Sequence, residues 1–116
     1  MITLLKDITP TYEEKAMGGE GRVQFHRPFT MEELGGRFCN LMRATLRPGD
    51  SVGVHSHTTN GEVYYMLEGS ATVIDDGVET VLHAGDAQFC ADGHTHGIYN
   101  HSDKDAAFLA IIVPNV

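Results

Sequence analysis

Four side chains in the middle of the sequence have the types and the spacing of a metal site. His55 and His57 lie two residues apart, Glu62 follows shortly afterwards, and His96 comes from much further along the chain. Imidazole nitrogens and a carboxylate oxygen together suit divalent first-row ions such as manganese, iron, nickel or zinc. The sequence therefore predicts one divalent metal ion that is held by His55, His57, Glu62 and His96.

A site of this kind is suited to binding a ligand. Structural zinc sites are closed and favour cysteine, whereas this cluster contains no cysteine. An octahedral ion with these four protein ligands keeps coordination positions free for a bidentate oxygen ligand, or for a substrate together with water or dioxygen. Such an ion can polarise a carbonyl or hydroxyl group or bind a chelating acid. We therefore expect a small oxygenated ligand.

Strands and a turn can bring these residues together. Side chains two apart share one face of a strand, so that His55 and His57 point the same way. The segment 58–61, Thr-Thr-Asn-Gly, has the composition of a turn that places Glu62 beside the two histidines. His96 must then come from a separate strand.

The spacing of these residues and of several glycines resembles the two motifs of the cupin superfamily, G-x5-H-x-H-x4-E-x6-G and G-x5-P-x-G-x2-H-x3-N. The matching positions are Gly49, His55, His57, Glu62, Gly69, Gly85, Gly93, His96 and Asn100, and Ala91 stands where the family has proline. The resemblance implies a small single-domain, all-β protein with the double-stranded β-helix, or jelly-roll, barrel of a cupin. It implies no particular activity.

Turn signals and strand-like runs support an all-β fold. Short runs rich in Val, Ile, Tyr, Phe and Thr alternate with turns such as Asp75-Asp76-Gly77, which is the pattern of a sandwich or barrel. The expected strands are Phe38–Leu46, Ser51–His57, Glu62–Leu67, Ala71–Asp75, Val78–Leu82, Ala87–Cys90, His96–Asn100 and Ala106–Val113. We expect one domain over residues 1–116, with the barrel core at 37–113.

Residues 1–36 differ from this core and are interpreted as an N-terminal arm. Val23–Phe29 is a further expected strand, and the segment from Thr30 to Glu33 has the spacing of a capping box ahead of a short helical turn. The resemblance to small cupins implies that such an arm pairs with a second subunit. The expected assembly is a homodimer.

The charge balance limits the partners. Sixteen acidic and eight basic residues give a net charge of −8, so polyanions are repelled on average. Nucleic acid and membrane are therefore not expected partners. Residues 1–7 lack the basic segment and the longer apolar run of a signal peptide, so we expect a cytoplasmic protein. Cys39 and Cys90 are expected to be buried free thiols, with a disulfide between them as the geometric alternative.

Other polar and sulfur-containing side chains are candidates for the ligand pocket. Alternation from Glu62 would place Tyr64 and Met66 on its side of the strand, as substrate contacts or as ordinary core. Arg43 could hold a carboxylate in bidentate fashion or lie solvated on the surface. Tyr64 and His94 are the candidates for a catalytic acid or base, although His94 is also compatible with partial exposure at a turn.

Three functions fit these observations. The first is a metalloenzyme such as a dioxygenase, decarboxylase or isomerase, acting on a carboxylate, a keto or hydroxy acid or a sugar acid. The second is a binding protein that captures the same small molecules through the metal without chemistry. The third is a structural barrel that has lost the ion. The sequence leaves open which of them applies, and with it whether the protein is an enzyme.

Overall fold

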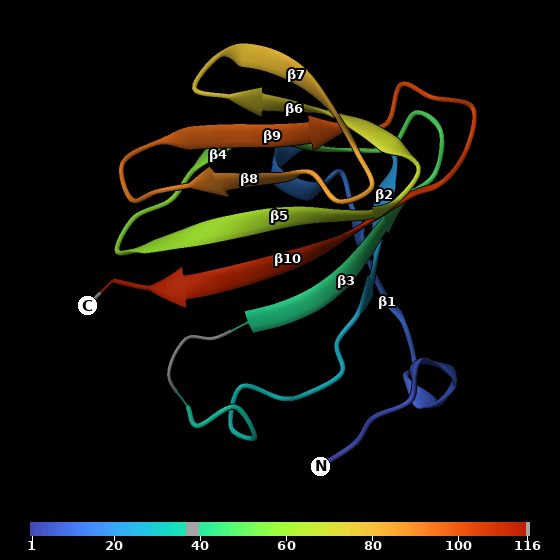
Figure 1. Cartoon of the computed structure of the whole chain (residues 1–116), viewed down its shortest axis with the longest axis vertical. Coiled ribbons are helices and arrows are strands. Elements are labelled where there is room, and N and C mark those ends of the chain that lie inside the picture. The colour runs from blue at the N-terminus through green and yellow to red at the C-terminus, as the bar shows by residue number, and fades with distance from the viewer. Residues whose placement is uncertain (37–39, 116) are drawn as a thin grey trace.

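Two antiparallel sheets form the molecule in a computed structural model that describes residues 1–36 and 40–115 (Figure 1). The larger sheet has the strand order β1 (Thr11–Glu14), β2 (Arg22–His26), β3 (Asn40–Leu46), β10 (Ala106–Pro114), β5 (Asn60–Glu68) and β8 (Ala87–Cys90). The smaller sheet has the order β4 (Ser51–Ser56), β9 (Thr95–Tyr99), β6 (Ser70–Asp75) and β7 (Val78–His83). Two short 3₁₀ helices, η1 (Leu5–Asp7) and η2 (Ala16–Gly18), lie in the N-terminal part.

The all-β prediction is confirmed, and the described ranges contain no α-helix. The strands expected within residues 51–113 are all present, with ends that differ by no more than a few residues. The expected tight hairpin at Asp75-Asp76-Gly77 is also present, since Asp75 pairs with Val78 and both turn residues have positive φ. The start of the strand expected at Phe38, together with Arg37 and Cys39, lies outside the described residues.

The N-terminal segment joins the larger sheet of its own chain. The strand expected at Val23–Phe29 is β2, which pairs with β3, and β1 pairs with β2 along Thr11–Glu14. The capping box is present: the Thr30 amide donates to the Glu33 side chain at 2.9 Å, and the Glu33 amide donates to the Thr30 hydroxyl at 3.0 Å. It closes a turn rather than a helix.

The core fills the space between the two sheets. Along β3, Met42, Ala44 and Leu46 are buried and alternate with partly exposed residues, as expected for strands with one face against a core. Phe108 of β10 in the larger sheet and Ile98 of β9 in the smaller sheet also belong to this core, and each is at most 1% exposed. The inner face of β3 is therefore the apolar one.

A β-bulge in β4 determines which way the His55 side chain points. Val52 pairs with Ile98 and His55 pairs with His96, so that β4 carries one extra residue over this interval. An extra residue reverses the alternation of side chains beyond it. As a result Val52 and His55 both face the interior, although three positions separate them.

Asn100 ties the turn after β9 to the rest of the barrel. Its side-chain nitrogen donates to the carbonyls of Leu46 at 2.9 Å and Lys104 at 2.7 Å, and its oxygen accepts from the amide and the hydroxyl of Ser102. The side chain is 1% exposed. Asn100 thus has the framework role expected from the sequence and does not lie among the four predicted ligands.

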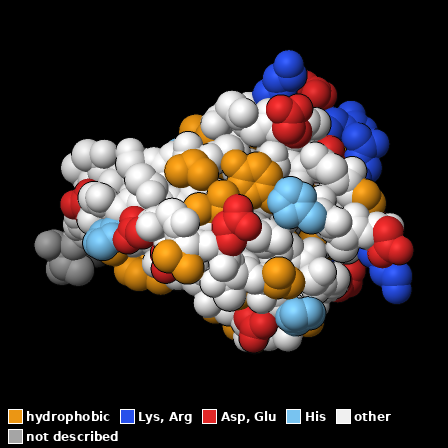
Figure 2. Space-filling view, turned by 90° about the horizontal axis from the view of Figure 1, so that it is seen from above, with side chains coloured by type: hydrophobic (Ala, Val, Ile, Leu, Met, Phe, Trp, Pro, Cys, Tyr) orange, Lys and Arg blue, Asp and Glu red, His pale blue; other side chains and the backbone are white. Residues whose placement is uncertain are grey.

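The outer surface is mixed in character. Figure 2 looks onto the end of the molecule that carries β6 and β7, where hydrophobic side chains lie among acidic ones. Val78 and Val81 of β7 are more than half exposed there. Within the described ranges, no helix has the length and apolar character needed to cross a membrane. The expected cytoplasmic location stays a prediction.

Candidate metal centre

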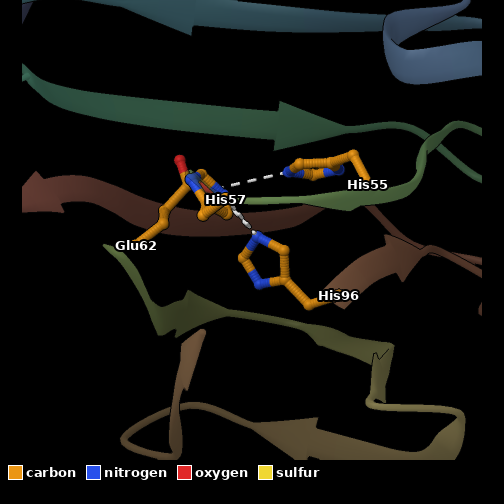
Figure 3. Close-up of side chains that lie close together, drawn as sticks. All are labelled: His55, His57, Glu62 and His96. Atoms are coloured by element: carbon orange, nitrogen blue, oxygen red, sulfur yellow. Dashed lines mark hydrogen bonds and ion pairs between the residues drawn. The ribbon is translucent and has the colours of Figure 1, made fainter. Parts of the chain in front are cut away.

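The four predicted ligands meet inside the barrel. His55 lies on β4, His57 directly after it, Glu62 on β5 and His96 on β9, and their ring and carboxylate ends point toward one another (Figure 3). One carboxylate oxygen, Glu62 Oε1, lies 3.0 Å from His96 Nε2, 3.2 Å from His57 Nε2 and 3.8 Å from His55 Nε2. His57, Glu62 and His96 are buried, and His55 is partly buried.

Each imidazole is oriented by a hydrogen bond on its far side. Nδ1 of His55 lies 2.7 Å from the Gly53 carbonyl, and Nδ1 of His57 lies 2.8 Å from Asn60 Oδ1. Nδ1 of His96 lies 2.8 Å from Gln88 Oε1. All three partners are oxygens that can only accept, so each Nδ1 must carry the hydrogen and donate it. In the neutral rings the three Nε2 atoms therefore present lone pairs to the common centre.

This donor set fits a single divalent ion. Metal–nitrogen and metal–oxygen bonds of about 2.0–2.2 Å place two ligands of one ion roughly 3 to 4 Å apart, depending on the angle between them. The four candidate ligand atoms lie within 4.8 Å of one another. A buried carboxylate surrounded by imidazole lone pairs also needs a compensating positive charge. These four residues can therefore hold a metal ion, and the choice among manganese, iron, nickel and zinc is open.

The close packing of the four side chains shifts the pKa values of Glu62, His55 and His96. Burial would raise the pKa of Glu62, but hydrogen bonds from His55 and His96 when these rings are protonated, and the positive charges of the protonated imidazoles, lower it to about 2. Burial lowers the pKa of His96 and outweighs the opposing Glu62 carboxylate. For His55, burial acts in the same direction but is outweighed by Glu62 and by the Gly53 carbonyl, which raise its pKa. The carboxylate thus stays ionised and ready to bind a cation.

A cavity of about 210 Å³ adjoins the cluster and is lined mainly by residues of the larger sheet. His55, His57 and Glu62 line one end of it, together with Tyr64. The Tyr64 ring stacks on His96 with centroids 4.3 Å apart and rings inclined by 7°, and it is 2% exposed. Burial, followed by the charge of Glu62, raises the pKa of Tyr64 well above its ordinary value, so that the phenol keeps its proton.

Comparison with known proteins identifies the family. The sequence model of the Cupin domain family matches residues 42–112. The chain belongs to the cupin family. It is 34% identical to an oxalate-binding protein from Thermotoga maritima over 97% of this chain and 93% of that protein. It is 28% identical to the tetracenomycin polyketide synthase protein TcmJ from Streptomyces glaucescens, over 95% of this chain and 69% of that protein.

A solved structure supports the same relationship. The crystal structure of a predicted oxalate decarboxylase from Thermotoga maritima superposes on this cupin with a TM-score of 0.95. The two chains are 33% identical, and the match covers 99% of this chain and 100% of that chain. The double-stranded β-helix barrel expected from the two sequence motifs is therefore confirmed.

The other candidate site residues of this cupin lie at varying distances from the cluster. Tyr64 lines the cavity, whereas Met66 is fully buried in the core and does not. Arg43 does not line it either: it lies on the outer face of β3 and forms an ion pair with Glu68 at 3.5 Å. Of the two alternatives that the sequence left open for Arg43, this arrangement matches the surface position. The reason is that the apolar residues alternating with Arg43 occupy the inner face.

His94 also lies apart from the metal centre. Its Nδ1 forms an ion pair with Asp76 in the turn between β6 and β7, and both side chains are about half exposed. The Asp76 carboxylate raises the pKa of His94. Partial exposure, one of the two alternatives left open by the sequence, is the arrangement that the structure has.

Two residues that contact the centre were not foreseen. Gln88 accepts from His96 and donates its side-chain amide to Asp75 Oδ1 at 3.1 Å, which fixes the orientation of the amide. Asn60, expected only as a turn residue, accepts from His57. Gln88 comes into position through the pairing of β8 with β5, in which it lies opposite Tyr64. No local sequence pattern indicates either contact.

Proposed function

We propose that this cupin binds one divalent metal ion through His55, His57, Glu62 and His96 and uses it to bind a small carboxylic acid. One observation carries the proposal: three imidazoles, each with its Nδ1 hydrogen directed away, turn their Nε2 atoms toward one buried carboxylate oxygen. The ion would supply a Lewis-acid site at which an acid can chelate.

The cavity and one relative support a small acid as the bound molecule. The cavity of about 210 Å³ is smaller than the roughly 300–1,000 Å³ of pockets for drug-sized ligands, so it suits a small metabolite. A Thermotoga maritima relative is named as an oxalate-binding protein, which supports an acid with two neighbouring oxygen donors. Oxalate is therefore the first molecule to test.

A chemical step on the acid is the second candidate function, and Tyr64 is the observation that favours it. Its phenol is buried in the cavity wall beside Glu62 and keeps its proton, which makes it a hydrogen-bond donor to a bound ligand and to negative charge that develops on that ligand. Decarboxylation, dioxygenation and isomerisation are the reactions expected for such a site. His94 takes no part in this proposal because it lies outside the cavity.

Calorimetric titration of the manganese-loaded protein with oxalate tests the proposal. We expect saturable binding near one acid per chain, which is lost in the chelator-treated protein. Chromatography of the same mixture after prolonged incubation separates the two candidate functions, because products indicate catalysis and unchanged oxalate indicates binding alone. Equal heats with and without metal would rule out metal-dependent capture of this acid.

A further inference from the structure

The cavity above the metal centre has two chemically different ends. One end carries three of the predicted ligands, His55, His57 and Glu62. Beyond Glu62, whose partner on β10 is Ile112, the lining continues across the larger sheet as a mostly apolar wall. The apolar side chains of this wall are Phe25, Met42, Phe108, Ala110 and Ile112, which come from β2, β3 and β10. Asn40 of β3, which pairs with Ile112, is its polar member. Because these three strands are neighbours in the larger sheet, the five side chains form one continuous surface. Four of them are less than 9% exposed, and Ile112 is partly exposed.

The charged groups at the outer end give no clear site for a second anion. The Arg27 guanidinium lies over the Phe25 ring, 4.8 Å from its centroid, and donates to the Thr11 hydroxyl at 2.7 Å. Glu13 lines the same cavity, and its charge contributes to the raised pKa of His55. A basic and an acidic side chain thus face the cavity together, so their opposite charges largely offset each other's effect on a ligand.

Oxalate has no apolar group that could pack against this wall. Both of its carboxylates are engaged when it chelates one ion, and it has no hydrocarbon surface. A wall of this kind gains binding energy only from apolar groups that it removes from water. The cavity therefore suits an acid that has a chelating end and an apolar body.

We infer that the preferred ligand is a monocarboxylic 2-oxo or 2-hydroxy acid with a branched alkyl or phenyl side chain. This inference rests on the proposed metal-dependent acid binding. The carboxylate and the neighbouring oxygen face the metal centre, and the side chain packs against Phe25, Met42 and Phe108. Each methylene group that becomes buried should strengthen binding about fourfold.

A series of probe acids tests the inference. The manganese-loaded full chain is titrated by calorimetry with oxalate, pyruvate, 4-methyl-2-oxopentanoate, phenylpyruvate and 2-oxoglutarate. We expect 4-methyl-2-oxopentanoate or phenylpyruvate to bind at least about tenfold more tightly than pyruvate. Oxalate binding without any gain along the apolar series would overturn this inference alone, and so would tightest binding of 2-oxoglutarate. Absence of binding by every acid would overturn the proposed function as well.

Paired variants on β10 locate the contact. Ile112 lines the cavity, whereas its neighbour Ile111 does not. The readout is the ratio of the dissociation constants for pyruvate and 4-methyl-2-oxopentanoate. Ile112→Ala should lower this ratio severalfold and Ile111→Ala should not change it. Ala110→Leu, which fills the cavity from the same strand, should lower the ratio too. An unchanged ratio in both cavity variants would contradict the assigned wall.

Discussion

The Nε2 atoms of His57 and His96 lie 3.1 Å apart inside the barrel. Because both rings donate their Nδ1 hydrogen elsewhere, the two neutral rings have no hydrogen to share between these nitrogens. Their lone pairs face each other next to the Glu62 carboxylate. A bound cation converts this repulsion into attraction, so the arrangement links metal binding to the stability of the barrel.

The contact between Gln88 and His96 leads to a first prediction. Gln88→Ala removes the acceptor that fixes the His96 ring, and the loss of such an outer partner usually lowers metal affinity about 10- to 100-fold. We expect this loss in a manganese titration followed by calorimetry. Gln24→Ala is the matched control, because Gln24 bonds to Tyr12 and does not line the metal cavity. Equal affinities for the two variants would show that Gln88 does not position His96.

Acidification should weaken metal binding, beginning near neutral pH. His55 has a pKa above the ordinary 6.5, so protons compete with the metal for its ring as the pH falls through that raised value. His96 has a lowered pKa, so protons compete with the metal for its ring only at lower pH. Glu62 stays ionised down to about pH 2. We expect the dissociation constant for manganese to rise by up to about tenfold per pH unit between pH 7 and 6. A constant affinity over this range would contradict proton competition at the imidazoles.

His94 should be dispensable for the metal centre. His94→Ala removes a half-exposed ion pair with Asp76 and leaves all four predicted ligands in place. We expect unchanged metal content by elemental analysis, and a melting temperature close to that of the parent protein because exposed ion pairs contribute little to stability. Loss of the metal in this variant would show that His94 participates in the site.

The homodimer stays a prediction, and the N-terminus is the place to test it. Although β1 and β2 pair within one chain, Met1, Ile2, Leu4 and Leu5 expose half or more of their surface. Exposed apolar side chains of this kind favour association with another surface. Light scattering should give twice the chain mass, and Ile2→Lys with Leu4→Lys should reduce it. A monomeric mass for the unaltered protein would exclude the dimer.

Much of the metal centre could be predicted because its geometry is local. Strand alternation places His55 and His57 on one face, and the short turn that follows brings Glu62 beside them. The bulge that turns Val52 inward could not be predicted, since it depends on how β4 pairs with β9. The role of Gln88 could not be predicted either, because it follows from the register between β5 and β8.

The orientation of Arg43 and the strand at Thr11–Glu14 could not be predicted either, and both have physical reasons. Alternation along β3 correctly places Arg43 on the opposite face from Met42 and Ala44. Which of the two faces points into the barrel depends on what packs against the strand, and alternation does not reveal this. The smaller sheet and β10 supply apolar partners, so the side with Met42 faces inward. The strand Thr11–Glu14 was missed because all four of its residues are exposed and show no alternation of polar and apolar types.

Metal content measured by elemental analysis tests the central claim most directly. The protein is produced without a metal-binding tag and purified without chelators. It is compared with two ligand variants, His57→Ala and Glu62→Ala. The control is His101→Ala, which alters a histidine outside the cluster. Close to one divalent ion per chain is expected for the parent protein and for His101→Ala, and strongly reduced content for the two ligand variants. A parent protein without stoichiometric metal that also fails to take up manganese, iron, nickel or zinc would contradict the account.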